Sequence, residues 1–317
     1  MSVYLVTGGA GFIGSNICQE LVKRGETVKV IDNFVAGKRE NLASFIDKIE
    51  LVEGDIRDLG LLSEITKGVD YILHQAALRS VPKSVGDPLS YDEVNVHGTL
   101  NVLLAAREAR VKRVVFASSS SIYGEAQVFP EKETHLPAPV SPYAASKIAG
   151  EHYCHVFSKV YGLETVSLRY FNVFGPRQSL ESQYAVVVPR FIINMLDEKP
   201  APIHGDGKQS RDFTYIDNVV EANILAATSD GVSGEAFNIA CGKDYKVLDL
   251  VAQINKILGK KVKPEFTPPR PGDVPRTLAD IGKAKKMLKL AVKVDFEKGL
   301  QKSIQWFKEH KEEYEPR

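Results

Sequence analysis

A tyrosine and a lysine four residues apart, Tyr143 and Lys147, lie in the motif SPYAASK, and a run of four serines at 118–121 precedes them. Ser141 can cap a helix and Pro142 suits its first position, so the tyrosine and the lysine are expected on one helical face. An ammonium beside a phenol stabilises the phenolate and lowers its pKa, which makes the tyrosine a usable base. The pair alone equally fits an ordinary amphipathic helix, so the rest of the chain must decide.

A glycine turn near the start of the chain is the first element that could position a ligand for this pair. A β-prone run at 3–7 is followed by Gly9, Gly11 and Gly14, spaced as G-x-G-x-x-G, and by a helical pattern that ends near Gly25. Glycines at these positions allow a tight turn and let a pyrophosphate approach the backbone at a helix N-terminus. The segment therefore predicts a dinucleotide site.

A second strand, predicted at 27–31, ends at Asp32. Asp32 follows the glycine turn at about the sequence separation expected for a carboxylate that hydrogen-bonds the adenosine ribose. Elsewhere such a residue would be an ordinary turn residue, but after a strand, a glycine turn and a helix we favour ribose binding. Because a carboxylate repels a 2′-phosphate, Asp32 favours NAD over NADP.

The alternation of strands and helices continues along the chain. Further strands are predicted at 49–53, 71–75 and 113–117, and helices near 59–67 and within 92–110. Such alternation indicates an α/β fold with a doubly wound parallel sheet of the Rossmann type, which binds ligands across the carboxyl ends of its strands.

A second, smaller α/β lobe is expected after Gly175, where the alternation weakens and Pro and Arg become more frequent. We expect residues 1–174 and about 211–242 to form the NAD-binding Rossmann domain. Residues about 175–210 and 243–317 are expected to form a substrate-binding domain.

Composition limits the compartment and the partners. The 317 residues include 41 Lys+Arg and 40 Asp+Glu, and this net charge of +1 gives no sign of a nucleic-acid or membrane-surface partner. The three cysteines, Cys18, Cys154 and Cys241, match no metal-ligand spacing, so no metal is expected, and their odd number suits a reducing cytoplasm. No apolar run approaches the roughly 20 residues of a membrane helix. We expect a soluble, cytoplasmic protein.

Ten motifs resemble those of the extended short-chain dehydrogenases/reductases and, within that family, the nucleotide-sugar 4-epimerases. Their order and spacing carry the resemblance over essentially the whole length. They are TGGAGFIG at 7–14, DN at 32–33, GDIRD at 54–58, HQAA at 74–77, NVHGT at 95–99, ASSSSIYG at 117–124, SPYAASK at 141–147, RYFNVFGPR at 169–177, SRDFTYIDN at 210–218 and RPGDV at 270–274.

The resemblance implies a bound NAD and assigns residues to it. The pyrophosphate would lie on the glycine turn, the adenosine ribose and adenine on the ends of the next two strands, and the rest of the cofactor further along the sheet. The residues implied are Gly8, Gly11, Phe12, Ile13 and Gly14 for the pyrophosphate, Asp32 and Asn33 for the ribose, Asp55 and Ile56 for the adenine, and Gln75, Ala76, Ala77, Asn95, Ser118 and Tyr170 for the remainder.

The resemblance also assigns the chemistry. Tyr143 would be the catalytic base and acid, Lys147 would lower its pKa and hold the nicotinamide ribose, and Ser119 would hydrogen-bond the sugar oxygen at carbon 4. Loss of the 4-hydroxyl proton and of a hydride gives a 4-keto sugar, which turns over and takes the hydride back on its other face. NAD is regenerated in each cycle and should stay bound.

Related dehydratases and decarboxylases form the same keto sugar and then need a further carboxylate, which follows the catalytic Ser or Thr. Those places carry Ser120 and Ser121 in this chain. Since a serine cannot replace a carboxylate in elimination at neutral pH, we expect the reaction to stop at epimerisation.

A UDP-sugar is the substrate that the resemblance implies. Two arginines would clamp the diphosphate, for which a guanidinium fork is suited, an aspartate would take the uridine ribose, and a short loop would frame the uracil. The residues expected to contact the substrate are Asn172, Arg211, Arg270 and Asp273, Pro202 and His204 of the loop, and Arg79, Ser120, Ser121, Val186, Val187 and Thr277 around the sugar.

The choice of sugar depends on three of these positions. Thr277 stands where a small residue leaves room for an acetamido group, which favours UDP-N-acetylglucosamine with overlapping UDP-glucose activity. Arg79 either reaches the cofactor pyrophosphate or narrows the sugar pocket, and Val186 differs from the residues usual there. A strict UDP-glucose 4-epimerase is the main alternative, and UDP-glucuronate is a weaker one, because Asn172 replaces the threonine usual in that subgroup.

Two helices, within 92–110 and at 142–161, carry apolar residues on more than one face. The surplus predicts a homodimer through a four-helix bundle, against complete burial within one subunit. The apolar residues are Leu100, Leu103, Leu104, Ile148, Ala149, Tyr153, Val156 and Phe157. Two other function classes are disfavoured. A non-catalytic NAD-binding scaffold or sensor is disfavoured because the chain retains the glycines, the tyrosine and the lysine. A reductase of a diffusing carbonyl substrate is disfavoured because of the arginines expected at the diphosphate.

Overall fold

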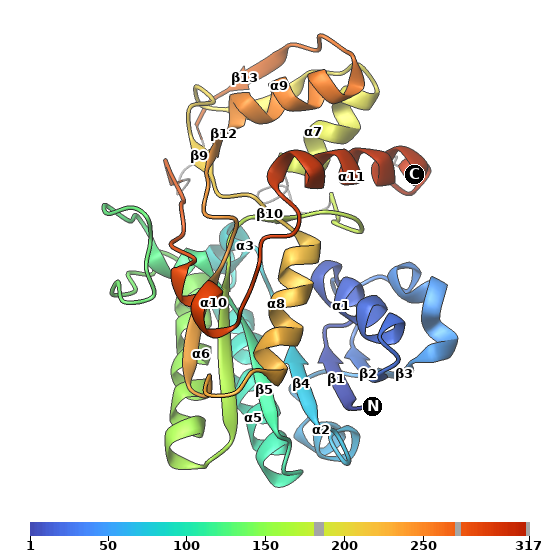
Figure 1. Ribbon diagram of the computed structural model, residues 1–317, viewed down its shortest axis with the longest axis vertical. Coiled ribbons are helices and arrows are strands. Elements are labelled where there is room, and N and C mark those ends of the chain that lie inside the picture. The colour runs from blue at the N-terminus through green and yellow to red at the C-terminus, as the bar shows by residue number, and fades with distance from the viewer. Residues whose placement is uncertain (181–186, 270–273, 315–317) are drawn as a thin grey trace.

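Residues 1–180, 187–269 and 274–314 are described by a computed structural model. Seven strands form one parallel sheet in the order β11-β6-β5-β4-β1-β2-β3 (Figure 1). This confirms the predicted doubly wound sheet. The strands are β1 (Val3–Thr7), β2 (Thr27–Asp32), β3 (Glu50–Glu53), β4 (Tyr71–His74), β5 (Arg113–Ser119), β6 (Glu164–Tyr170) and β11 (Glu235–Ile239).

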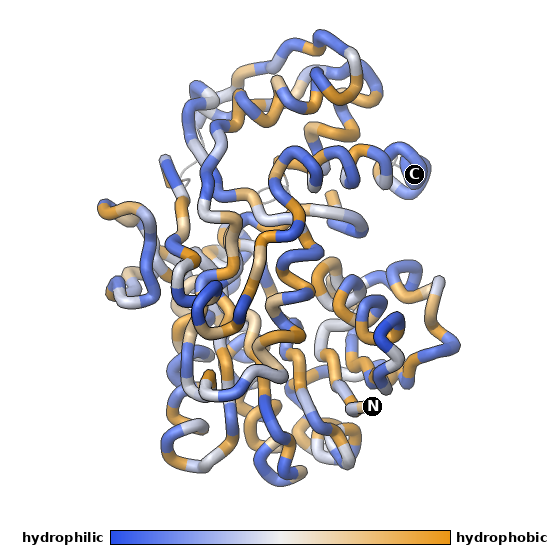
Figure 2. Tube along the Cα trace, viewed as in Figure 1, coloured by the Kyte–Doolittle hydropathy of each residue, from blue (hydrophilic) through white to orange (hydrophobic). Residues whose placement is uncertain are grey.

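Helices cover both faces of this sheet, and each face has its own apolar core. One core joins α1 and α8 to the sheet, and the other joins α2, α5 and α6 to it. Figure 2 shows the apolar residues concentrated along the central strands, as expected for strands buried on both faces. These helices are α1 (Phe12–Lys23), α2 (Leu59–Ile65), α5 (Gly98–Glu108), α6 (Pro142–Val160) and α8 (Ile216–Thr228). A π-helical turn, η2 (Glu93–His97), leads into α5.

Helix α6 begins as its sequence predicts. The Ser141 side chain accepts a hydrogen bond from the Ala144 amide at 3.2 Å, and Pro142 occupies the first turn. Near its middle, Glu151 forms an ion pair with Arg169 of β6 at 2.8 Å, and both side chains are buried. Arg169 also donates to the Tyr123 hydroxyl at 2.8 Å. Each polar group of this network therefore has a partner, which a buried ion pair requires.

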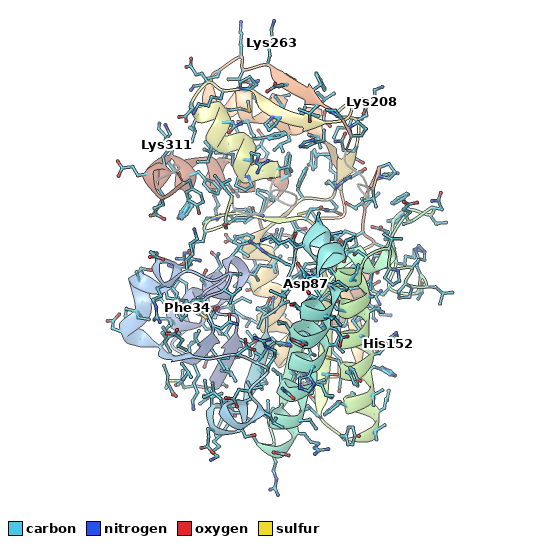
Figure 3. The ribbon with its side chains drawn as sticks, turned by 180° about the vertical axis from the view of Figure 1, so that it is seen from behind. Phe34, Asp87, His152, Lys208, Lys263 and Lys311 are labelled. Carbon is cyan, nitrogen blue, oxygen red and sulfur yellow. The ribbon has the colours of Figure 1, made fainter. Side chains whose placement is uncertain are left out.

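The smaller lobe packs three helices beside a two-stranded sheet. Helix α7 (Val187–Leu196) contacts α9 (Val247–Leu258) and α11 (Phe296–Glu309), and β8 (Ala201–His204) pairs in parallel with β13 (Pro264–Thr267). Figure 3 shows Lys208 and Lys263 at the far end of this lobe. The remaining short elements are η1 (Arg39–Lys48), α3 (Val81–Gly86), α4 (Pro88–Asp92), η3 (Ser120–Tyr123), β7 (Val173–Phe174), β9 (Ser210–Arg211), β10 (Thr214–Tyr215), β12 (Tyr245–Lys246), α10 (Gly282–Met287) and η4 (Lys311–Tyr314).

An aromatic cluster joins the two lobes. The Phe296 ring of α11 stacks on Tyr245 with centroids 4.3 Å apart and on Phe213 at 5.3 Å, and Phe174 meets it edge-on at 5.9 Å. Helix α10, which follows residue 243, contacts β11 of the large sheet. The division of the chain into two domains remains a prediction, since the two lobes share one core.

Two buried carboxyl groups also lie at this junction. Asp212 accepts backbone hydrogen bonds from Cys241 at 3.0 Å and Gly242 at 2.9 Å, and Glu131 accepts one from Leu278 at 3.3 Å. Desolvation is the main cause that raises the pKa of each carboxyl to about 7. Because burial disfavours their charged forms, these groups hold protons at a pH where exposed carboxyls have lost them.

None of the helices within the described ranges is sufficiently long and apolar to cross a membrane. Across the same residues, no three His, Cys, Asp or Glu side chains are grouped so that they could hold a metal ion.

The buried ion pair gives a test of what holds α6 on the sheet. Glu151→Gln leaves the Arg169 charge without a counter-ion in a buried site, so we expect it to lower the free energy of unfolding by about 3 kcal/mol. The matched control is Glu64→Gln, which removes a charge from an exposed pair whose partners, Lys67 and Glu64, have 66% and 71% of their side chains exposed. The control should change stability by less than about 1 kcal/mol. Urea denaturation of both variants measures this, and equal losses would contradict the prediction.

Candidate active site

A cavity of about 1090 Å³ lies at the carboxyl ends of the central strands. It gathers residues from the glycine turn, from the loops after β2, β3 and β4, from the end of β5 and from α6. The residues expected there that do line it are Gly8, Gly11, Phe12, Ile13, Gly14, Asp32, Asn33, Asp55, Ile56, Gln75, Ala76, Ala77, Arg79, Ser118, Ser119, Tyr143, Lys147, Tyr170 and Asn172.

The glycine turn forms a backbone cradle at one side of the cavity. A Cβ on Gly14 would lie 2.2 Å from the Gly8 carbonyl oxygen, and Gly8 itself has a φ of +66°. Helix α1 begins directly after Gly11, which has no capping side chain, so its first amides remain available at the cavity. A close turn before free helix amides fits a dinucleotide pyrophosphate, and larger side chains here would fill its place.

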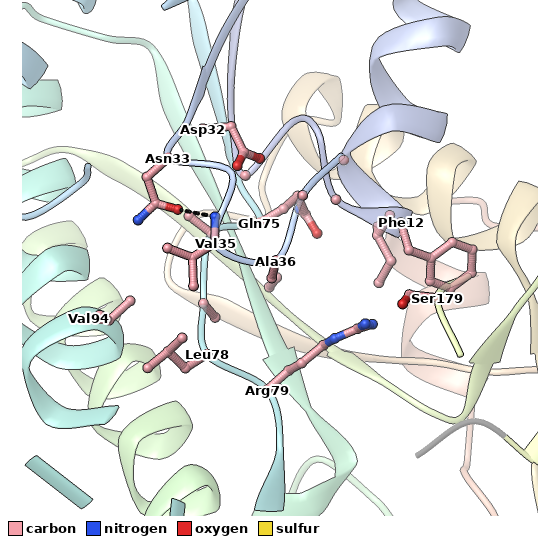
Figure 4. A pocket seen from close by; sticks show the side chains of 18 of the residues that line it. Phe12, Asp32, Asn33, Val35, Ala36, Gln75, Leu78, Arg79, Val94 and Ser179 are labelled. Atoms are coloured by element: carbon pink, nitrogen blue, oxygen red, sulfur yellow. Dashed lines mark hydrogen bonds between the residues drawn. The ribbon is translucent and has the colours of Figure 1, made fainter. Parts of the chain in front are cut away.

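Asp32 ends β2 at the cavity with its carboxylate already oriented. Its two oxygens accept backbone hydrogen bonds from Ala10 at 2.9 Å and Phe34 at 2.8 Å. Burial raises the pKa of this carboxyl, and the two amides partly offset that effect. Figure 4 shows Asp32 and Asn33 side by side, with the hydrogen bond from the Val35 amide to Asn33 at 3.2 Å. This arrangement suits the hydroxyls of an adenosine ribose.

Asp55 is held at the end of β3 by a partner that sequence reasoning did not single out. Arg57 donates to both Asp55 oxygens, at 2.9 and 2.8 Å, and Asn33 donates to it at 2.8 Å. The hydrogen bonds from Arg57 lower the pKa of Asp55 to about 2, so it is a fixed anion. An adenine amino group could donate to such a carboxylate.

Tyr143 and Lys147 both line the cavity, and Lys147 is bonded to the backbone of β5. Its Nζ donates to the Ala117 carbonyl at 2.9 Å, and burial lowers its pKa to about 8. Burial raises the pKa of Tyr143; a hydrogen bond from Ser119 and the charge of Arg79 act in the opposite direction. The pKa of Tyr143 is therefore raised overall in this structure, and its lowering by Lys147 remains a prediction.

Two residues of the serine run, Ser118 and Ser119, line the cavity, and the other two do not. Ser119 caps η3 by accepting from the Ser121 amide at 3.2 Å, and its oxygen also accepts from the Ser121 hydroxyl at 2.9 Å. Ser120 and Ser121 begin η3 and do not line the cavity. Their expected contact with the sugar remains a prediction.

Asn95 was expected beside the cofactor, but the structure places it behind the cavity wall. It is 1% exposed and does not line the cavity. Its side chain bonds both the amide and the carbonyl of Leu78, and Leu78 lines the cavity. Asn95 therefore shapes the site through Leu78, since its side-chain amide is bonded to the Leu78 backbone and to the Ser146 hydroxyl.

The residues expected to hold the nucleotide of the substrate are only partly brought together. Pro202 and His204 lie on β8 and Arg211 on β9, outside the residues that line the cavity. Val187 begins α7 and packs against the apolar core. Three expected contacts, Val186, Arg270 and Asp273, lie outside the described residues.

Thr277 and Asn172, which were assigned separate roles, are bonded to each other. The Asn172 amide donates to the Thr277 hydroxyl at 2.8 Å and to the Asp212 carbonyl at 3.2 Å. Asn172 also has a φ of +35°, a conformation that asparagine tolerates better than most residues. Thr277 thus orients Asn172, which lines the cavity.

The C-terminal end of the described chain contributes residues to the cavity that no sequence motif predicted. Glu313 and Tyr314 of η4 line the cavity beside Arg177. Arg177 donates to the Ser15 carbonyl at 3.3 Å and to Gln19 at 3.1 Å, which ties this rim to α1. These contacts join segments more than 130 positions apart, so local sequence patterns carry no signal for them.

The orientation of Asp32 generates a prediction on cofactor choice. A 2′-phosphate would meet a buried carboxylate, so NADP should bind at least about tenfold more weakly than NAD. Asp32→Asn keeps an acceptor but removes the charge, and should reduce this difference. Fluorescence titration of both cofactors onto protein stripped of nucleotide measures it. Wild-type protein that binds NADP as tightly as NAD would refute the assignment.

Known proteins that resemble this chain share its full length. The family model described as "NAD dependent epimerase/dehydratase family" matches residues 4–240. A UDP-N-acetylglucosamine 4-epimerase from Methanobrevibacter ruminantium is 40% identical, with a TM-score of 0.93 and 98% and 99% of the two chains covered. A UDP-glucose 4-epimerase from Thermotoga maritima is 38% identical, with a TM-score of 0.92 and 97% and 99% covered. A putative UDP-glucose 4-epimerase of Methanocaldococcus jannaschii is 38% identical over 306 residues, which cover 96% of this chain and 98% of the relative. These matches show that the chain belongs to the NAD-dependent epimerase/dehydratase family, among the extended short-chain dehydrogenases/reductases.

Proposed function

We propose that this protein catalyses the NAD-dependent 4-epimerisation of a UDP-sugar. The observation that carries the proposal is the placement of Tyr143 and Ser119 in the same cavity as the glycine cradle and Asp32. The similar 4-epimerases support it, because they match over nearly the whole chain. The free thiols Cys18, Cys154 and Cys241 support a reducing compartment, the cytoplasm.

The residues of the cavity have separable tasks in this reaction. NAD, when bound, would accept the hydride from carbon 4 and later supply the same hydride for the reverse transfer. Tyr143 takes the proton of the 4-hydroxyl and gives it back to the same oxygen when the hydride has returned to the other face of carbon 4. Ser119 holds the oxygen at carbon 4 through the hydroxyl that also bonds Tyr143. Lys147, fixed by the Ala117 carbonyl, is placed to hold the nicotinamide ribose.

We do not propose elimination of water from the keto sugar, because the serine run contains no carboxylate that could support it. The segment 117–124 is ASSSSIYG. Among the described cavity residues the carboxylates are Asp32, Glu40, Asp55 and Glu313, and none belongs to that segment or to α6. The proposal therefore ends at the return of the hydride.

We further propose UDP-N-acetylglucosamine as the preferred substrate, with overlapping activity on UDP-glucose. Thr277 has a small side chain, and its hydroxyl accepts a hydrogen bond from Asn172 at 2.8 Å. No larger side chain therefore projects from this position. A strict UDP-glucose 4-epimerase is the alternative, in which Arg79 narrows the sugar pocket.

A homodimer through α5 and α6 belongs to the same proposal. Val156 and Val160 of α6 are 42% and 68% exposed, and Tyr153 on the same face is 37% exposed. Leu103 and Phe157 are buried within the subunit, so they do not contribute to the surplus. An exposed apolar strip on a 19-residue helix favours pairing with a second copy.

Activity and sugar choice can be measured together. Purified protein without added NAD, given UDP-N-acetylglucosamine and in parallel UDP-glucose, should form the 4-epimer of both, the first at least as fast, as followed by proton NMR of the anomeric signals. Tyr143→Phe should lower turnover by at least about a hundredfold because it removes the proton carrier. Tyr71→Phe, at the opposite end of the sheet, is the control and should retain activity. Near-normal turnover by Tyr143→Phe would exclude the assigned base, and formation of only UDP-galactose would favour the narrow pocket.

The dimer has its own test. Val156→Glu places a charge on the exposed strip of α6 and should shift the solution mass measured by light scattering from two subunits toward one. Val35→Glu, on a 73% exposed side chain away from α6, is the control and should remain dimeric. A monomeric wild-type protein would refute the bundle.

A further inference from the structure

Three side chains at one wall of the cavity are joined in a closed ring of hydrogen bonds. Asn223 of α8 donates through Nδ2 to the Tyr170 hydroxyl at 2.8 Å, and the Gln75 side-chain amide donates to Asn223 Oδ1 at 3.0 Å. The Tyr170 hydroxyl lies 3.2 Å from Gln75 Oε1 and 3.0 Å from Asn223 Oδ1. Asn223 Nδ2 also donates to the Val219 carbonyl at 2.8 Å, which anchors this side chain to its own helix.

One proton assignment gives every polar atom of the ring a partner. A phenol has a single proton to donate. Burial raises the pKa of Tyr170, so this proton stays on the hydroxyl. Because Asn223 Oδ1 already accepts from Gln75, the ring closes when the Tyr170 proton is donated to Gln75 Oε1. Each side chain is then both donor and acceptor, and its orientation follows from the other two.

Two residues of the ring face the cavity, and the third lies behind them. Gln75 and Tyr170 line the cavity, whereas Asn223 does not line it and has an exposed fraction of 0%. Figure 4 shows Gln75 among the side chains that line the cavity. Both cavity residues are among those that the sequence resemblance assigns to NAD. Asn223 lies outside the ten motifs and has no assigned role.

The ring joins two strands of the sheet that are not neighbours. Gln75 directly follows β4 and Tyr170 is the last residue of β6, while β5 lies between these strands. Strands two positions apart are separated by about 10 Å, which is beyond the reach of a direct backbone hydrogen bond. Helix α8 contacts both β4 and β6, on the face of the sheet opposite to α6. Asn223 therefore ties the two strand ends together from that face.

The backbone of Gln75 also contacts the glycine turn. Its amide donates to the Thr7 carbonyl at 3.1 Å, and a Cβ on Gly8 would lie 3.1 Å from the Gln75 carbonyl carbon. The ring thus adjoins the backbone cradle on one side and carries the Tyr170 phenol on the other. A wall whose polar groups are already oriented has less freedom to lose when a ligand binds.

We propose that Asn223 is a positioning residue for the cofactor, which orients Gln75 and Tyr170 toward NAD and thereby sets how tightly NAD is held. Asn223 itself lies behind the cavity wall, so it acts on the affinity for NAD and not on the proton transfer by Tyr143. The inference rests on the use of NAD, which the family shares, and does not depend on which sugar is epimerised.

A purely structural role for a buried asparagine is the alternative, and α8 supplies a matched control against it. Asn218 of the same helix is 2% exposed. Its side chain donates to the Val294 carbonyl at 2.6 Å and accepts from the Lys293 and Val294 amides at 3.1 and 3.2 Å. The two asparagines share a helix, burial and several hydrogen bonds. They differ in that only the partners of Asn223 include residues that line the cavity.

The test is the dissociation constant of NAD, measured by isothermal titration calorimetry on protein stripped of nucleotide. Asn223→Leu has a similar volume but no polar side-chain atom, and should weaken NAD binding about tenfold because Gln75 and Tyr170 lose their orientation. Asn218→Leu should stay within about twofold of wild type in NAD binding, although it lowers thermal stability. With saturating NAD, the kcat of Asn223→Leu should stay within about threefold of wild type, since the proton carrier is unchanged.

Two further variants test whether Asn223 acts through the ring. Asn223→Ser can still bond the Val219 carbonyl but is too short to close the ring, so it should also weaken NAD binding, and it serves if Asn223→Leu does not fold. Tyr170→Phe removes the hydroxyl from the ring. In that background Asn223→Leu should weaken NAD binding by less than about threefold further, because part of its effect is already lost.

Three results would overturn the proposal: unchanged NAD affinity in the Asn223 variants, an equal loss in Asn218→Leu, or full additivity of Asn223→Leu with Tyr170→Phe. The last two would assign Asn223 to the stability of α8 alone. Wild-type protein that binds NAD but forms no 4-epimer would instead reject the proposed function and leave this inference standing, so the two failures are distinguishable.

Discussion

The buried ion pair between Glu151 and Arg169 is the constraint on which the site depends. It joins α6, which carries Tyr143 and Lys147, to the strand beside β5. The same carboxylate accepts from the Ser118 hydroxyl at the cavity wall. Charges removed from water tolerate little misplacement, because each lost partner leaves an uncompensated group. Helix α6, which carries Tyr143 and Lys147, is thereby held in one register on the sheet.

The sheet could be predicted from the sequence because local patterns decide it. The strands at 3–7 and 113–117 and the glycine turn are defined by neighbouring residues, and they lie where the alternation placed them. Most residues of the cofactor side of the cavity could be predicted, but their contacts could not. The spacing of Tyr143 and Lys147 places them on one helical face, yet it does not reveal that the Ala117 carbonyl takes the ammonium.

Long-range contacts explain the other differences. Asn95 lies in a motif typical of the family, but whether its amide faces a ligand or the Leu78 backbone depends on a loop 17 positions away. Glu313 and Tyr314 reach the cavity only because α11 packs on the smaller lobe. The bond between Thr277 and Asn172 joins residues 105 positions apart. Such pairings follow from the packed fold, and a single sequence carries no trace of them.

The carboxyl groups of Asp212 and Glu131, buried where the two lobes meet, make the stability of the fold depend on pH. Their pKa values of about 7 lie above those of the same groups in an unfolded chain, about 4. The folded protein therefore binds protons that the unfolded chain releases between about pH 4 and 7, and the stability supplied by this uptake is lost as the pH rises through that window. Near neutrality, unfolding is a proton-releasing process, so the heat that accompanies it includes the protonation heat of whatever buffer surrounds the protein.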